Sequence, residues 1–174
     1  MDIVEFFELS AGKWFSQRTV HNLTSGNLEA GKSNLVMEAL APDHAIVTDI
    51  CSSHGVDAGL VAKGLQLTWE GTIESNPDQQ RGSAVLVTIC DRSTPLQGKL
   101  LQQQQAHGQN QSLIGRYLMG KDDVLTLSIE SDQFKAEERI WYLIPNLRLR
   151  TSIVNYNNGL ALASFCSEIR MGLT

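Results

Sequence analysis

One stretch of the chain alternates positively charged and apolar side chains. Residues 147–152 read Leu-Arg-Leu-Arg-Thr-Ser, so an extended strand would place Arg148, Arg150 and Ser152 on one face and the two leucines on the other. Two guanidinium groups on one face can each bind a carboxylate through two parallel hydrogen bonds. Arginine is seldom buried without a partner, so the same pattern also allows leucines inside and arginines in water. Periodicity alone leaves both assignments open.

A pair of adjacent acids precedes this stretch. Glu137 and Glu138 would face opposite sides of a strand, so one of them points inward if the strand has a buried face. An inward carboxylate is either a partner for Arg148 or Arg150 or a counter-ion for a cationic ligand. Surface charge is the alternative for both acids.

Hydrolytic chemistry has no candidate set of residues in this sequence. We find no nucleophile placed beside a base, no paired catalytic carboxylates and no phosphate-binding glycine motif. The histidines are scattered singly, which predicts no metal site; they are His21, His44, His54 and His107. The three cysteines are widely spaced and form no C-x-x-C pair, which predicts a reducing compartment; they are Cys51, Cys90 and Cys166.

Length and charge limit the classes of protein that the chain can belong to. Its 174 residues, 42% of them hydrophobic, suit one domain over residues 1–174. A formal net charge of −5 lacks the basic excess that nucleic acid or anionic membrane surfaces require, so we expect neither partner. Apolar runs are short and acidic residues stand in the first five positions, which predicts a soluble, cytoplasmic protein.

Two short helices are expected. The first covers residues 2–12, because Asp2 and Glu5 have the spacing of a capping box and Gly12 can end the helix. The second begins at Pro42, a residue favoured at the first helical position, and ends before Gly55.

Most of the remaining sequence alternates with period two, as strands do. Residues 65–73 are the clearest example and place Trp69 on the apolar, inward face. The Asn157-Asn158-Gly159 triplet is a strong hairpin signal, and the glutamine run at residues 102–105 suits a solvated strand end. Many short strands with no helix between the later ones predict a mainly β fold, an antiparallel meander that closes into a barrel or folds into a sandwich. A barrel of this size has room for one small ligand.

Three stretches resemble a known family over nearly the whole chain. They are Phe6–Thr19, Glu138–Ser152 and Phe165–Arg170. The Asn-Leu-Arg-Leu-Arg block at residues 146–150 and the Ser-Glu-Ile-Arg block at residues 167–170 are the most specific. Together these stretches resemble the S-type phycobiliprotein lyases, the CpcS/CpeS family of cyanobacteria and some algae.

The resemblance implies a lipocalin-like (calycin) up-and-down barrel with an N-terminal helix and one further short helix. It implies that the barrel binds a linear tetrapyrrole, a phycobilin such as phycocyanobilin, as substrate and directs it onto a cysteine of a phycobiliprotein subunit. The expected acceptors are phycocyanin β, allophycocyanin or both. No prosthetic group is then required. Arg148 and Arg150 suit the two propionates of the bilin, Ser152 adds a hydroxyl, and Trp69 suits its aromatic system.

Two further residues enter through the family stretches. Glu138 is expected to pair with protonated pyrrole nitrogens and is the candidate catalytic residue, and Arg18 is a further candidate on the ligand side. The expected mechanism is positional, with the acceptor's cysteine as the nucleophile and none of the chain's own cysteines required.

Two other functions stay open on the sequence alone. One is a non-catalytic, lipocalin-like carrier of bilin or another amphipathic anion. The other is an interaction module with a filled interior, whose outward Leu147, Leu149 and Ile153 form a partner surface. The same three side chains would suit a homodimer interface.

Overall fold

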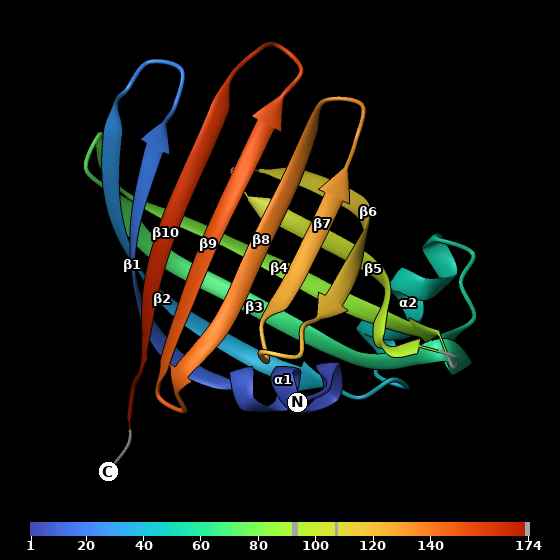
Figure 1. Cartoon of the computed structure of the whole chain (residues 1–174). Helices are drawn as coiled ribbons and strands as arrows, with labels where there is room; N and C mark the ends of the chain where they lie inside the picture. The colour runs from blue at the N-terminus through green and yellow to red at the C-terminus, as the bar shows by residue number, and fades with distance from the viewer. Residues whose placement is uncertain (92–93, 107, 173–174) are drawn as a thin grey trace.

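Antiparallel strands close into a barrel in the computed structural model, which describes residues 1–91, 94–106 and 108–172. Within these residues there are ten strands, two α-helices and one short 3₁₀ turn (Figure 1). The helices are α1 (Ile3–Ser10) and α2 (Ala45–Ser53), and the turn is η1 (Ala58–Leu60). The strands are β1 (Gly12–Asn22), β2 (Leu28–Leu40), β3 (Val61–Ile73), β4 (Asn76–Asp91), β5 (Thr94–Ala106), β6 (Gln109–Met119), β7 (Leu125–Glu130), β8 (Phe134–Ile144), β9 (Leu147–Tyr156) and β10 (Ala161–Arg170).

Every strand pairs with its neighbour in the sequence, and β10 returns to pair with β1. This last pairing runs from Trp14 opposite Arg170 to Asn22 opposite Leu162 and leaves no free sheet edge. The predicted hairpin at residues 157–159 joins β9 to β10, with Gly159 at a φ of 88° that favours glycine. The mainly β, up-and-down barrel with an N-terminal helix and one further short α-helix is therefore confirmed.

The N-terminal helix closes one end of the barrel. The predicted capping box forms, since the Asp2 side chain accepts from the Glu5 amide and the Glu5 side chain accepts from the Asp2 amide. Phe6 and Phe7 are buried in one cluster with Trp14. The indole of Trp14 donates to the Ser10 carbonyl at 2.9 Å, so α1 forms a floor fixed to the first strand (Figure 1).

The second helix lies outside the barrel wall, where Val47, Ile50 and Cys51 pack against Val87 and Leu101. Its predicted start at Pro42 is wrong. Helix α2 begins at Ala45, and the side chain of His44 caps it by accepting from the Ile46 amide at 3.3 Å. A residue with a side chain that can accept this hydrogen bond satisfies an orphan amide, which Pro42 cannot do.

No helix in the described part of the chain is long and apolar enough to cross a membrane.

Candidate functional site

The arginines of β9 point into the barrel. Arg148 is only 3% exposed, whereas Ile153, on the other face of the strand, is 50% exposed. The alternative with leucines inside and arginines in water is therefore wrong for this strand. Leu147 and Leu149 lie half-buried on the outer surface, and α1 does not cover them because it packs on the barrel floor.

Arg148 is fully engaged by the protein itself. Its Nε donates to Glu168 Oε2 at 2.6 Å and its Nη1 donates to Ser10 Oγ at 3.0 Å. Glu168 is completely buried, so this is a dry ion pair that joins β9 and β10 to the end of α1. The structure thus separates Arg148 from Arg150 and does not support the prediction that both guanidinium groups form one ligand clamp.

Arg150 lies between two carboxylates. Its Nη1 is 3.4 Å from Glu138 Oε1 and its Nη2 is 3.3 Å from Glu168 Oε1. Its Nη2 also donates to the Sγ of Cys166 at 3.6 Å. Burial by itself raises the pKa of Glu168, but the positive charges of Arg150 and Arg148 together lower it by more than burial raises it. The pKa of Glu168 therefore lies below its ordinary value. Glu168 therefore stays ionised, and Arg150 stands at the boundary between the dry floor and the open interior.

A pocket of about 280 Å³ lies above this boundary inside the barrel. Its lining includes Arg18, Ser33, Trp69, Gln80, Gln104 and Arg150. Of the six predicted site residues, three thus meet in one pocket: Arg18 from β1, Trp69 from β3 and Arg150 from β9.

The side chains of Arg18 and Trp69 are both open to this pocket. Arg18 is exposed, and among the described residues no carboxylate lies within ion-pair distance of it. The Trp69 ring packs directly on the backbone of Gly82, where an added Cβ would lie 2.2 Å from a ring carbon. Only glycine at position 82 leaves room for this ring orientation, which turns the indole into a wall of the pocket.

Glu138 and Ser152 sit beside the pocket rather than in its lining. They are register partners on β8 and β9, and both are half-buried. Glu138 pairs with Arg150, and the Ser152 hydroxyl shares a 2.6 Å hydrogen bond with the hydroxyl of Ser164. Glu138 is the inward member of the acidic pair, and Glu137 is exposed on the outer face.

Sequence reasoning missed three polar residues of the interior. Glu168, Gln80 and Gln104 are all buried or half-buried there. The signal for Gln104 was its place in a run of glutamines along β5. Successive side chains of a strand point to opposite faces, so a run of this kind must turn every second glutamine toward the interior. For Glu168 the signal was its place in the Ser-Glu-Ile-Arg block.

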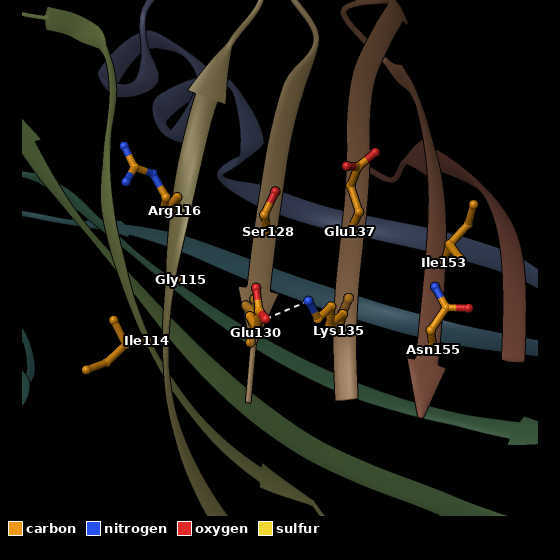
Figure 2. A pocket seen from close by; sticks show the side chains of 11 residues that line it. Ile114, Gly115, Arg116, Ser128, Glu130, Lys135, Glu137, Ile153 and Asn155 are labelled. Atoms are coloured by element: carbon orange, nitrogen blue, oxygen red, sulfur yellow. Dashed lines mark ion pairs between the residues drawn. The ribbon is translucent and has the colours of Figure 1, made fainter. Parts of the chain in front are cut away.

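A larger hollow, of about 560 Å³, lies on the outer face of β6 to β9 (Figure 2). The labelled side chains that stand along it include Ile114, Arg116, Glu130, Lys135, Glu137 and Ile153. Glu130 and Lys135 form an ion pair at 2.6 Å, and both are well exposed. None of the six predicted site residues lies there, so we assign the functional site to the interior pocket.

The described residues contain no cluster of histidine, cysteine or acidic side chains that could hold a metal ion. His107 lies outside the described residues, so the absence of a metal site stays a prediction. The interior offers cations, an aromatic wall and neutral amides, an arrangement that suits binding of an aromatic anion.

Comparison with known proteins agrees with this geometry. Residues 2–171 match the family described as CpeS-like protein. A chromophore lyase CpcS/CpeS 1 from Trichodesmium erythraeum is 48% identical over 171 residues, covering 98% of this chain and 98% of the relative. A phycocyanobilin lyase subunit CpcS from a Picosynechococcus species is 37% identical over 172 residues, covering 98% of this chain and 86% of that protein.

A solved structure has the same fold. The S-type phycobiliprotein lyase CPES from Guillardia theta matches with a TM-score of 0.87 and 31% sequence identity, covering 100% of this chain and 95% of that one. The resemblance drawn from the three sequence stretches is therefore confirmed.

Proposed function

The chain belongs to the CpeS-like family and is a chromophore lyase, and on that premise we propose that it binds phycocyanobilin non-covalently and directs its attachment to a phycobiliprotein cysteine. The phycocyanin β subunit and allophycocyanin are the proposed acceptors. The Picosynechococcus relative is named as a phycocyanobilin lyase subunit, which supports this bilin. The cytoplasm of a cyanobacterial cell is the proposed compartment, because the named relatives include cyanobacterial proteins.

One observation carries the proposal: Arg18, Arg150 and Trp69 line a single pocket inside the barrel. A bilin has two propionates and an extended conjugated system. Two guanidinium groups match the propionates and an indole face matches the conjugated rings. Arg18 takes the place that Arg148 was predicted to have, because Arg148 is held in the floor by Glu168 and Ser10.

Binding would rearrange the charges around Arg150. A propionate that approaches Arg150 competes with Glu138, whose contact with Arg150 is 3.4 Å long and partly exposed. Once displaced, the Glu138 carboxylate can accept hydrogen bonds from pyrrole N–H groups or pair with a protonated bilin. Ser152, the register partner of Glu138, lies within the same part of the wall and adds a hydroxyl there.

The pocket volume favours a positional mechanism. At about 280 Å³ it is at the lower end of ligand sites, so it would hold only part of a linear tetrapyrrole, and the rest would extend through the barrel mouth. The exposed ring A ethylidene would then meet the acceptor's cysteine. The thiol adds across that double bond: sulfur bonds to one carbon, the proton goes to the bilin, and no group leaves. Holding one conformer selects the carbon and the face of attack.

A non-catalytic bilin carrier is the second candidate. The positional mechanism uses the acceptor's thiol and needs no nucleophile from the chain, so the pocket suits a carrier as well as a lyase, and the names of the relatives favour the lyase. Both functions use the same pocket and differ only in whether attachment is accelerated.

The experiment that separates them mixes the purified protein with phycocyanobilin and an apo-phycobiliprotein β subunit. Absorbance follows binding, and acid-stable chromophore on the acceptor in a denaturing gel measures attachment. We expect correctly coloured covalent product that forms faster than without the protein. Binding without faster attachment would leave a carrier, and no binding would refute the pocket assignment.

A further inference from the structure

The two walls of the pocket differ in chemistry. The wall formed by β1 and β9 contributes the cations Arg18 and Arg150, while β4 and β5 contribute the neutral amides of Gln80 and Gln104. A bilin has the same two-sided character. In its closed, helical conformer the propionates lie on one edge and the two lactam carbonyls of the outer rings lie on the opposite edge.

The glutamine run on β5 is divided between inside and outside. Gln102 and Gln104 are half-buried and face the interior, whereas Gln103 and Gln105 are exposed. Placing an amide in a partly dry interior costs free energy unless its hydrogen bonds are met. Gln102 and Gln104 therefore lie at interior positions where leucine would be favoured if the interior bound only apolar rings.

Hydrogen bonding within the interior leaves defined groups open. Gln102 Nε2 donates to Gln104 Oε1 at 3.2 Å, which orients the Gln104 amide. Among the described residues, Gln104 Nε2 has no hydrogen-bond partner of its own. Gln80 donates through Nε2 to the Asp78 carbonyl at 3.2 Å, so its Oε1 remains an open acceptor nearer the mouth. Gln104 thus presents donors, and Gln80 an acceptor, to the pocket.

We infer that Gln104 is a specificity-determining residue that donates to a lactam carbonyl of the bilin, with Gln80 accepting from a ring N–H nearer the mouth. This inference rests on the proposed function, since it needs the bilin in this pocket. Arginines on one wall and glutamines on the other then recognise opposite edges of the same ligand. The pocket would therefore discriminate against macrocyclic tetrapyrroles such as porphyrins, which have propionates and an aromatic system but no lactam.

The test compares a linear with a macrocyclic tetrapyrrole. Phycocyanobilin and metal-free protoporphyrin IX are titrated separately against the wild type and against Gln104→Leu, with binding followed by absorbance. We expect Gln104→Leu to weaken phycocyanobilin binding about three- to tenfold, the loss of one neutral hydrogen bond, and to leave protoporphyrin binding unchanged. The selectivity ratio falls by the same factor.

Two matched controls come from the same strand. Gln103→Leu and Gln105→Leu make the identical change on the outer face and are expected to keep both affinities. Gln104→Glu keeps the length and polarity of the side chain but replaces the donor with an acceptor, so it should lose at least as much bilin affinity. It keeps the test decisive if Gln104→Leu fails to fold.

The outcomes separate the inference from the function. If the wild type binds phycocyanobilin and Gln104→Leu and Gln104→Glu change neither affinity, or weaken both tetrapyrroles equally, the inference is refuted while the proposed function stands. If the wild type binds no phycocyanobilin, both are refuted.

Discussion

Arg148 and Arg150 show how two identical side chains on one face of a strand come to do different things. Arg148 is buried and bonded to Glu168 and Ser10, whereas Arg150 has part of its guanidinium open to the pocket. We expect Arg148→Ala to lower the free energy of unfolding by about 3–5 kcal/mol, because it leaves the Glu168 carboxylate buried beside a single weaker partner. Urea unfolding measures this.

Arg150→Ala is the complementary change. We expect phycocyanobilin binding to weaken about tenfold, with a stability loss of no more than about 2 kcal/mol, because Arg148 still pairs with Glu168. Absorbance titration and urea unfolding give the two numbers. If Arg148→Ala unfolds like the wild type and loses the bilin instead, the floor assignment of Arg148 is wrong.

Glu168 makes stability depend on acid. Its pKa in the folded protein lies below the ordinary 4.5, because the attraction of Arg150 and Arg148 outweighs the effect of burial. A depressed folded pKa gives stability that is fully present above the unfolded pKa and is lost as pH falls through the folded pKa. We therefore expect the stability difference between wild type and Glu168→Gln to be constant from pH 6 to 8 and to shrink below about pH 4.5. Urea unfolding at several pH values checks it, and a difference that grows in acid would contradict it.

The chain's own thiols are not expected to take part in attachment. Burial, and then Asp57, raise the pKa of Cys51, so its thiol stays protonated and is a poor nucleophile. Cys166 is also buried. We expect Cys51→Ser, Cys90→Ser and Cys166→Ser each to retain chromophore transfer per folded molecule. The denaturing-gel assay measures it, with an acceptor lacking its own cysteine as the negative control. Loss of transfer in a well-folded variant would show that the thiol is needed.

At the residue scale, sequence reasoning chose the right face for some residues and could not choose for others. Trp69 was placed inward by simple alternation. Arg148 and Arg150 were ambiguous because the cost of burying a guanidinium depends on partners elsewhere in the chain. Glu168 and Ser10 lie 20 and 138 residues from Arg148, and periodicity within one strand carries no information about them.

At the element scale, α1 owes its position to both local and distant contacts. The capping box fixes its start, while Ser10 and the indole of Trp14 fix its end to the barrel. Arg170, on β10, also donates to the carbonyls of Leu9 and Ala11, which are left open where the helix ends. The helix is only eight residues long, so these end contacts decide whether it forms.

Removing the N-cap tests this account. We expect Asp2→Ala to lower the free energy of unfolding by about 1 kcal/mol, because the Glu5 amide loses its acceptor. Asp49→Ala is the matched control, since Asp49 is an exposed residue inside α2 and caps no helix. Urea unfolding compares the two. Equal losses would mean that the capping box adds nothing to the floor.

The strands were easier to predict than the start of the second helix. Period-two alternation is a property of each strand by itself, so it survives without knowledge of the neighbours. The start of α2 depends on which residue caps it, and the choice between Pro42 and His44 is made by the path of the chain after β2. Local preference alone could not decide it.

At the scale of the whole molecule, the sequence left a barrel and a sandwich open, because both have the same alternation. What closes the barrel is the long pairing of β1 with β10, from Trp14 opposite Arg170 to Asn22 opposite Leu162. Pairing between the two ends of a chain leaves no local signal. Closure was indicated only by the family resemblance.

Closure also exposes an apolar outer face on β9 and β10. Ile153, Phe165 and Ile169 are 50%, 45% and 49% exposed, and Leu147, the register partner of Ile169, lies beside them. Turning the charged face of β9 inward to form the site necessarily turns these side chains outward. A contiguous apolar face on a sheet is typical of an interface between subunits.

We therefore expect the protein to form a homodimer through this face, with β9 and β10 of two copies packed across a two-fold axis. Sedimentation velocity over a range of concentrations should show a dimer, and Ile169→Lys should shift it to monomer, because a charge buried at the axis would face its own copy. Leu60→Lys is the control, since Leu60 is an exposed apolar residue of η1, far along the chain from this face.

Because the pocket is on the other side of the barrel wall, the monomeric variant should keep its affinity for phycocyanobilin. A wild type that sediments as a monomer at every concentration would defeat the expectation, and a variant that loses bilin binding together with the dimer would show that the outer face and the interior are coupled.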